Sequence, residues 1–66
     1  MKKISVSLSG HFTSISMEEE FIDALKQIAA AQKKSVASII NDIDKTRNKK
    51  NLSAAIRVWI LKQYMQ

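Results

Sequence analysis

The side chains best suited to recognising a ligand alternate along residues 12–17. A period of two is typical of a β-strand, whose successive side chains point to opposite faces. The inward positions of this pattern are Thr13, Ile15 and Met17. The outward positions are Phe12, Ser14 and Ser16. Serine hydroxyls donate and accept hydrogen bonds and a phenyl ring can contact a thymine methyl group, so a two-stranded ribbon with this outer face has the chemistry to read DNA base edges. The alternative is that the face is only a solvated strand edge.

A second group of polar residues suits an anion. Ser35 is a good N-cap residue for a helix, and the free backbone N–H groups from Ser35 to Ala37 would then point at a phosphate. Lys33 and Lys34 precede this position and add positive charge. An N-cap serine is common in helices of every kind, so this signal supports a phosphate contact only together with others.

The residue types of this chain give little support to a catalytic function. The chain has one histidine, His11, no cysteine and no His pair at metal-ligand spacing, which argues against a dedicated metal site. The acidic residues 18–20 lie where a helix begins, and its dipole already explains them there. A single glycine cannot form a phosphate-binding loop. We therefore expect a protein that is not an enzyme and that uses no cofactor and no metal.

The charge indicates the kind of partner. Eleven Lys and Arg against six Asp and Glu give a net charge of +5, which favours polyanions such as nucleic acid or an anionic membrane. Neither a signal peptide nor an apolar run of about 18 residues is present, so we expect a soluble, cytoplasmic, nucleoid-associated protein. A membrane-surface role through the third helix has little support, because Arg57 and Lys62 supply few charges there.

The elements that position these residues follow from local patterns. Residues 3–17 read as strand, interrupted by Gly10, which either turns the chain into a hairpin or kinks an extended arm. Ser16 and Glu19 have the spacing of a capping box, which predicts that a helix begins at residue 18. Apolar residues at helical spacing then predict helices over 18–33, 35–46 and 51–65, the last capped by Asn51 or Ser53.

The size of the chain favours a dimer. Sixty-six residues form one domain, 1–66, with a small core and no disulfide, so association with a second copy is the expected extra source of stability. The helix over 51–65 is apolar nearly all round, which also points to a partner subunit. The candidate dimer-core residues are Thr13, Ile15, Met17, Phe21, Leu25, Ile39, Ile40, Ile43 and Trp59.

The order of a polar-apolar strand, a helix, a short link and a second helix resembles the ribbon-helix-helix DNA-binding fold of the Arc and MetJ type. The resemblance covers Phe12 to about Thr46, and the segments HFTSISMEEEF, KKSVASIINDID and NLSAAIRVWIL are similar to small bacterial members with a third helix. The implied fold is mainly α with an N-terminal β-ribbon, a third C-terminal helix and an intertwined homodimer in which one strand per subunit pairs antiparallel.

The resemblance also implies roles. Phe12, Ser14 and Ser16 become base-facing residues in the major groove, and Lys33, Lys34, Ser35 and Ala37 become phosphate contacts. His11 lies next to this face and could add a contact. Related members often carry arginine or other long polar residues on the ribbon, so specificity here would rest on tandem dimers or DNA shape. The expected function is a repressor or autoregulator that binds double-stranded DNA. The alternative is a protein-interaction module, such as an antitoxin-like adaptor that docks a partner through the third helix.

Overall fold

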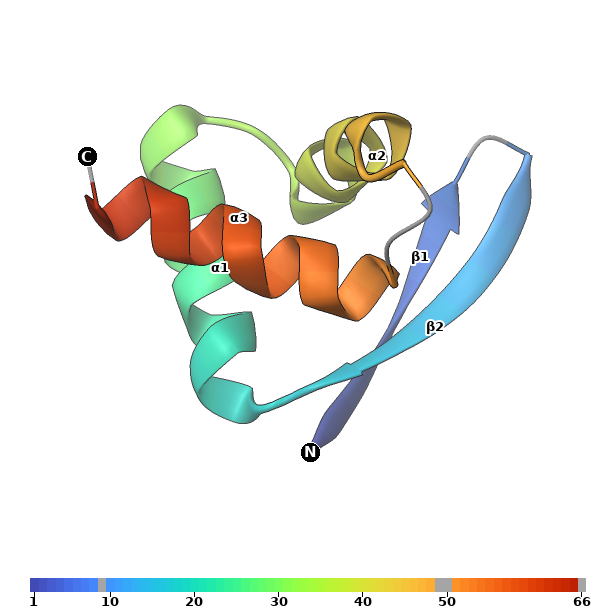
Figure 1. Ribbon diagram of the computed structural model, residues 1–66, viewed down its shortest axis with the longest axis horizontal. Helices are drawn as coiled ribbons and strands as arrows, with labels where there is room; N and C mark the ends of the chain where they lie inside the picture. Colours follow the sequence, from blue (N-terminus) through green and yellow to red (C-terminus); the bar gives the residue numbers. More distant parts are fainter. Residues whose placement is uncertain (9, 49–50, 66) are drawn as a thin grey trace.

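A two-stranded ribbon and three helices make up the computed structural model, which describes residues 1–8, 10–48 and 51–65. In chain order they are β1 (Lys2–Leu8), β2 (His11–Met17), α1 (Glu19–Gln32), α2 (Val36–Thr46) and α3 (Leu52–Met65). Each helix boundary lies within one residue of the predicted range. Figure 1 shows the ribbon projecting to one side of the three helices, with α3 crossing in front of α1.

The two strands form an antiparallel hairpin, which settles the question of hairpin or arm. Gly10 in the connection has φ +90°, a left-handed conformation that glycine adopts without a steric penalty. The strand partner of β2 is therefore β1 of the same chain, with Ile4 opposite Ile15 at the centre. The resemblance to the Arc and MetJ type implied pairing between subunits; in this structure one chain completes the ribbon by itself.

Burial follows the period-two pattern on both strands. Val6, Leu8, Ile15 and Met17 are buried against the helices, whereas Ser5, Ser7, Phe12 and Ser14 on the other face are exposed. In the packing, α2 contacts β1 and α3 contacts β2, so these two helices cover the inner face of the ribbon. A two-stranded hairpin alone is marginally stable in water, and this helical cover supplies the burial that it lacks.

The apolar core extends through all five elements. Four of its members are completely inaccessible to solvent: Met17, Leu25, Ile40 and Ile56. The other buried residues are Val6, Leu8, Ile15, Ile22, Ala29, Ile39, Ile43, Leu52 and Ile60. Each strand and each helix therefore contributes buried apolar residues to one core within the protomer, while α3 keeps Val58, Leu61, Tyr64 and Met65 exposed on its other side.

The start of α1 differs from the predicted capping box. Ser16 lies in β2 opposite Lys3, the N-cap residue is Glu18, and that residue makes no side-chain capping hydrogen bond. The strand continues through Ser16 because Met17 is fully buried in the core. Burial of Met17 in the core thus overrides the local capping signal at Ser16. Glu19 and Glu20 lie in the first turn of α1, where they interact favourably with the helix dipole.

The end of α1 is a Schellman motif without glycine. The Lys34 N–H donates to the Ala29 carbonyl at 3.0 Å and the Lys33 N–H donates to the Ala30 carbonyl at 3.2 Å. Lys33 has φ 57° and ψ 38°, the left-handed conformation that a side chain with a Cβ adopts at a cost of about 1 kcal/mol. The same residue that turns the chain toward α2 therefore carries backbone strain.

Lys33→Gly is expected to stabilise the protein by up to about 1 kcal/mol, because glycine removes this strain at the cost of a more flexible unfolded chain. In a domain of this size that gain raises the melting temperature by about 4–8 °C. Gln32→Gly, one residue earlier and inside the helix, is the matched control and should lower the melting temperature. A lower melting temperature for Lys33→Gly as well would contradict the assignment of strain to Lys33.

Candidate nucleic-acid interface

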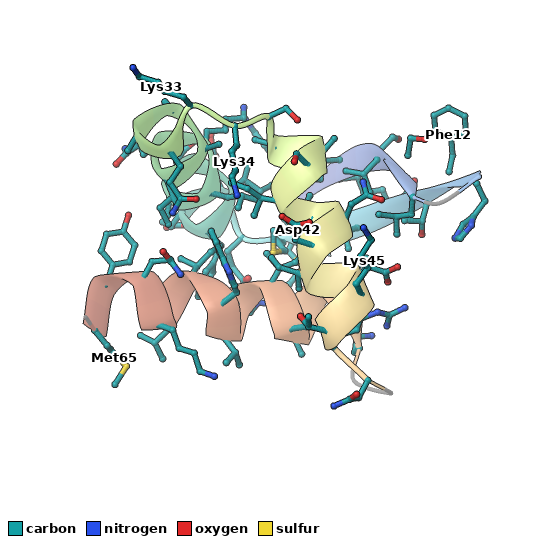
Figure 2. The ribbon with its side chains drawn as sticks, turned by 90° about the horizontal axis from the view of Figure 1, so that it is seen from above. Phe12, Lys33, Lys34, Asp42, Lys45 and Met65 are labelled. Atoms are coloured by element: carbon teal, nitrogen blue, oxygen red, sulfur yellow. The ribbon has the colours of Figure 1, made fainter. Side chains whose placement is uncertain are left out.

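The outer face of the ribbon carries side chains from both strands. Facing pairs on this face are Lys3 with Ser16, Ser5 with Ser14, and Ser7 with Phe12. Phe12 is 82% exposed and, as Figure 2 shows, it projects from the far end of the ribbon, away from the helices. The surface is therefore a strip of four hydroxyls with a cation at one end and an aromatic ring at the other.

Sequence reasoning found only half of this strip. Phe12, Ser14 and Ser16 lie outward as predicted, although Ser16 is half-buried. The sequence did not assign Lys3, Ser5 and Ser7 to the strip. Their alternation with Ile4 and Val6 indicates a strand, but not whether that strand pairs with β2. The antiparallel register brings them onto the same face, and that register depends on the pairing of the two strands rather than on either strand alone.

The N-terminal end of α2 lies beside this strip. Ser5 of the ribbon and Ala37 of α2 line the same hollow of about 170 Å³. One turn further along α2, the Asn41 Nδ2 donates hydrogen bonds to the Ser7 carbonyl at 2.9 Å and to the Ala37 carbonyl at 2.8 Å. These contacts attach α2 to β1, so the start of α2 lies next to the strand that carries Ser5 and Ser7.

The predicted phosphate residues gather where α1 passes into α2. Lys33, Lys34, Ser35 and Ala37 are all exposed, and Ser35 is the N-cap residue of α2. The Ser35 Oγ accepts a hydrogen bond from the Ser38 N–H at 3.0 Å. In Figure 2 Lys33 extends away from the helices, and the ribbon and the start of α2 lie in the upper half of the view, whereas α3 lies in the lower half.

Ser35→Ala is expected to destabilise the protein by about 1 kcal/mol, because the Ser38 N–H loses its acceptor at the exposed start of α2. The loss should appear as a lower melting temperature in circular dichroism. Ser38→Ala is the matched control: it removes an exposed hydroxyl from the same turn, leaves the capping bond intact and should change the melting temperature little. Equal stability of both variants would show that the cap contributes nothing.

His11 lies at the edge of this surface rather than on it. His11 pairs with Leu8 and therefore lies on the same side of the ribbon as the inward residues of β2. It lines a hollow of about 300 Å³ together with Thr13 and Arg47. Arg47 donates a hydrogen bond from Nε to the Asp44 carboxylate at 2.7 Å. His11 is thus adjacent to the strip, at the side where β2 meets the connection between α2 and α3.

The residues assigned to a dimer core lie in the core of the single chain. Ile15, Met17, Leu25, Ile39, Ile40 and Ile43 are buried there without a second subunit. Thr13, Phe21 and Trp59 are half-buried, and the two aromatic residues pack against the core from its rim. A dimer interface would therefore have to use other surfaces or the exposed parts of these three residues.

Two further properties bear on the function classes considered above. Among residues 1–8, 10–48 and 51–65, no group of His, Cys, Asp or Glu side chains is arranged to hold a metal ion. In the same part of the chain, no helix is long and apolar enough to cross a membrane.

An N-terminal antiparallel two-stranded ribbon followed by three helices is the arrangement of the ribbon-helix-helix class with an added C-terminal helix. A comparison with protein families agrees: the model described as "Ribbon-helix-helix domain" matches residues 1–64, and the chain belongs to that family. Proteins with this domain are generally DNA-binding transcription regulators or antitoxins. No curated protein and no solved structure gave a significant match.

Proposed function

We propose that this protein is a sequence-specific DNA-binding regulator, a repressor or autoregulator, that inserts its β-ribbon into the major groove. The single observation that supports this proposal most is the hydroxyl strip, because five of its six members are polar and the strip lies on the solvent side of the ribbon. A two-stranded ribbon fits the major groove, which is about 12 Å wide.

The members of the strip have distinct tasks in this proposal. Ser5 and Ser14 form the central facing pair and hydrogen-bond to base edges, while Phe12 contacts a thymine methyl group. Lys3 lies at the end of the strip nearest α1 and interacts with the phosphate backbone. Short hydroxyls reach only bases directly beneath them, so the sequence dependence of DNA shape contributes the rest of the specificity.

The start of α2 fixes the ribbon in the groove. The backbone N–H groups of the first helical turn have no acceptor within the helix, and the positive end of the helix dipole lies there. Val36 and Ala37 supply these N–H groups to a phosphate that flanks the groove, and Lys33 and Lys34 add charge. Because α2 is attached to β1 through Asn41, the phosphate contact and the base contacts keep a fixed spacing.

The test is a fluorescence-anisotropy titration of the purified protein against duplex DNA from its own upstream region and against a scrambled duplex, each at two salt concentrations. Tighter binding to the upstream duplex is expected, with log K falling with log salt by about 0.9 for each phosphate contact. Equal, weak binding to both duplexes that disappears at moderate salt would contradict the proposal. In that case the charge of +5 alone attracts DNA, and an antitoxin-like protein-binding role gains support.

A further inference from the structure

A polar hollow lies between β2 and the start of α3, and the proposed contacts of the ribbon and of α2 leave it without a role. It has a volume of about 300 Å³. Its polar lining comes from β2, from the C-cap of α2 and from the first residues around the start of α3: His11, Thr13, Ser14, Arg47, Asn51 and Ser53. None of the described residues that line the hollow is acidic.

The lining of this hollow is rich in hydrogen-bond donors. The Asn51 Oδ1 accepts a hydrogen bond from the Ala54 N–H at 3.3 Å, so the NH₂ group at the other end of the amide remains a donor. His11 has an N–H donor in either protonation state. Thr13 and Ser53 are half-buried, and their hydroxyls have no partner in the part of the chain that the structure describes. A ligand with several acceptor oxygens would satisfy these groups.

Arg47 supplies positive charge to the hollow, and an ion pair orients its side chain. The Arg47 Nε donates a hydrogen bond to the Asp44 Oδ1 at 2.7 Å, and the two side chains are 31% and 23% exposed. Asp44 offsets part of the charge, but it does not line the hollow, so its carboxylate positions the guanidinium without occupying the site. A guanidinium presents its N–H donors in a fixed plane that matches the oxygens of a phosphate.

We propose that this hollow binds a phosphate group. The proposal goes beyond the DNA contacts described above, because it concerns a different place on the fold. The start of α2 lies against β1, whereas the hollow lies where β2 meets α3, and Figure 1 shows the start of α3 beside the ribbon. The phosphate belongs either to a small phosphorylated molecule or to DNA bound along the ribbon, since Ser14 is part of both the hollow and the hydroxyl strip.

A phosphate group fits this lining better than a cation or an apolar molecule does. A cation would find no carboxylate among the described lining residues. An apolar molecule would take water away from the half-buried hydroxyls and the guanidinium without replacing its hydrogen bonds, which costs free energy. The volume, about 300 Å³, is at the lower end of the range for small-molecule sites, so a phosphate fits together with part of the group that carries it.

The first test is a titration of the full chain with sodium phosphate, without DNA, followed in amide NMR spectra at constant pH and ionic strength. Sodium chloride is the reference salt. Saturable shifts are expected at the amides of His11, Thr13 and Ser53. Phosphate at the start of α2 would shift the amides of Val36 and Ala37 instead, so the two places are read separately.

Ser53→Glu places a carboxylate in the hollow and should raise the dissociation constant for phosphate at least about tenfold, because it replaces a donor with a like charge. An acidic residue in the first turn of α3 suits the helix dipole, so the fold should be retained, as circular dichroism checks. Ala54→Glu is the matched control: it adds the same charge one residue later, at an exposed position outside the hollow, and should change the constant little. Ser53→Ala is a milder second variant that should raise the constant about threefold.

Asp44→Asn should have the opposite effect. The amide oxygen of asparagine still accepts a hydrogen bond from Arg47, while the negative charge that offsets the guanidinium is gone. Phosphate binding should strengthen about threefold, the size expected for a partly exposed ion pair. Asp42→Asn removes the same charge at an exposed position of α2 and serves as the control.

Anisotropy titrations of the two glutamate variants with the preferred duplex identify the source of the phosphate. If DNA supplies it, Ser53→Glu binds DNA more weakly than Ala54→Glu, and the slope of log K against log salt decreases by about 0.9. Equal DNA affinity of the two variants, together with saturable shifts from free phosphate, assigns the hollow to a small phosphorylated molecule.

The proposal is overturned if free phosphate gives no saturable shifts in the hollow and the two glutamate variants do not differ in DNA affinity. It is also overturned if Ser53→Glu and Ala54→Glu weaken phosphate binding equally, since only long-range charge then acts. A protein that binds no DNA at all contradicts the function proposed above, and the phosphate titration then decides alone whether the hollow is a site.

Discussion

Ile15→Asp is expected to leave the chain largely unfolded. The Ile15 side chain is 5% exposed, on the inner face of β2. An aspartate at this position has to lose the hydration of its carboxylate in apolar surroundings, or take up a proton to avoid that cost. In both cases the free energy of unfolding falls by more than about 4 kcal/mol. Losses of this size are characteristic of buried charges and large cavities. The total stability of a chain this long is about 3–10 kcal/mol.

The measurement is the far-ultraviolet circular dichroism spectrum together with a thermal melt. Ser14→Asp is the control, because it makes the same change one residue earlier, on the exposed face. It should keep a native spectrum and a cooperative melt, with a loss of at most about 1 kcal/mol from the lower strand propensity of aspartate. A native spectrum for Ile15→Asp would show that the inward and outward faces of β2 have been assigned the wrong way round.

Ser14→Asp is expected to have the second large effect, on DNA affinity. Ser14 lies opposite Ser5 at the centre of the hydroxyl strip, so a carboxylate there meets the negative potential of the groove and accepts hydrogen bonds only. Affinity for the preferred duplex should fall at least about a hundredfold, equivalent to about 3 kcal/mol. Ser14→Ala removes one hydroxyl without adding charge and should weaken binding about fivefold, near 1 kcal/mol.

The charge change requires its own control. Gln27→Glu lowers the net charge by the same single unit at an exposed position of α1 that belongs neither to the hydroxyl strip nor to the start of α2. Anisotropy titrations should show a small effect that disappears as salt rises, because only long-range screening is involved. If Gln27→Glu and Ser14→Asp weakened binding equally, the ribbon face would not be the DNA-reading surface.

Much of the local structure was predictable because its signals are short-range. The alternation at Phe12, Ser14 and Ile15 predicted which face of β2 is outward, and the Ser35 cap predicted the start of α2. Asn51 also caps α3 through a hydrogen bond from the Ala54 N–H at 3.3 Å, one of the two alternatives considered. The exception is the predicted capping box at Ser16, which is wrong. Met17 is buried in the core, so β2 continues through Ser16 and the helix is capped at Glu18.

The sequence by itself determined the faces of the strands and the extents of the helices, since side-chain periodicity and caps act over a few residues. Only the tertiary structure decided that β1 pairs with β2 in the same chain, which brings Ser5 and Ser7 to the hydroxyl strip. It also decided which side of α3 stays exposed: a helix that is apolar all round has no periodicity to mark its buried face. That choice depends on which elements pack against α3, and those contacts join residues far apart in the chain.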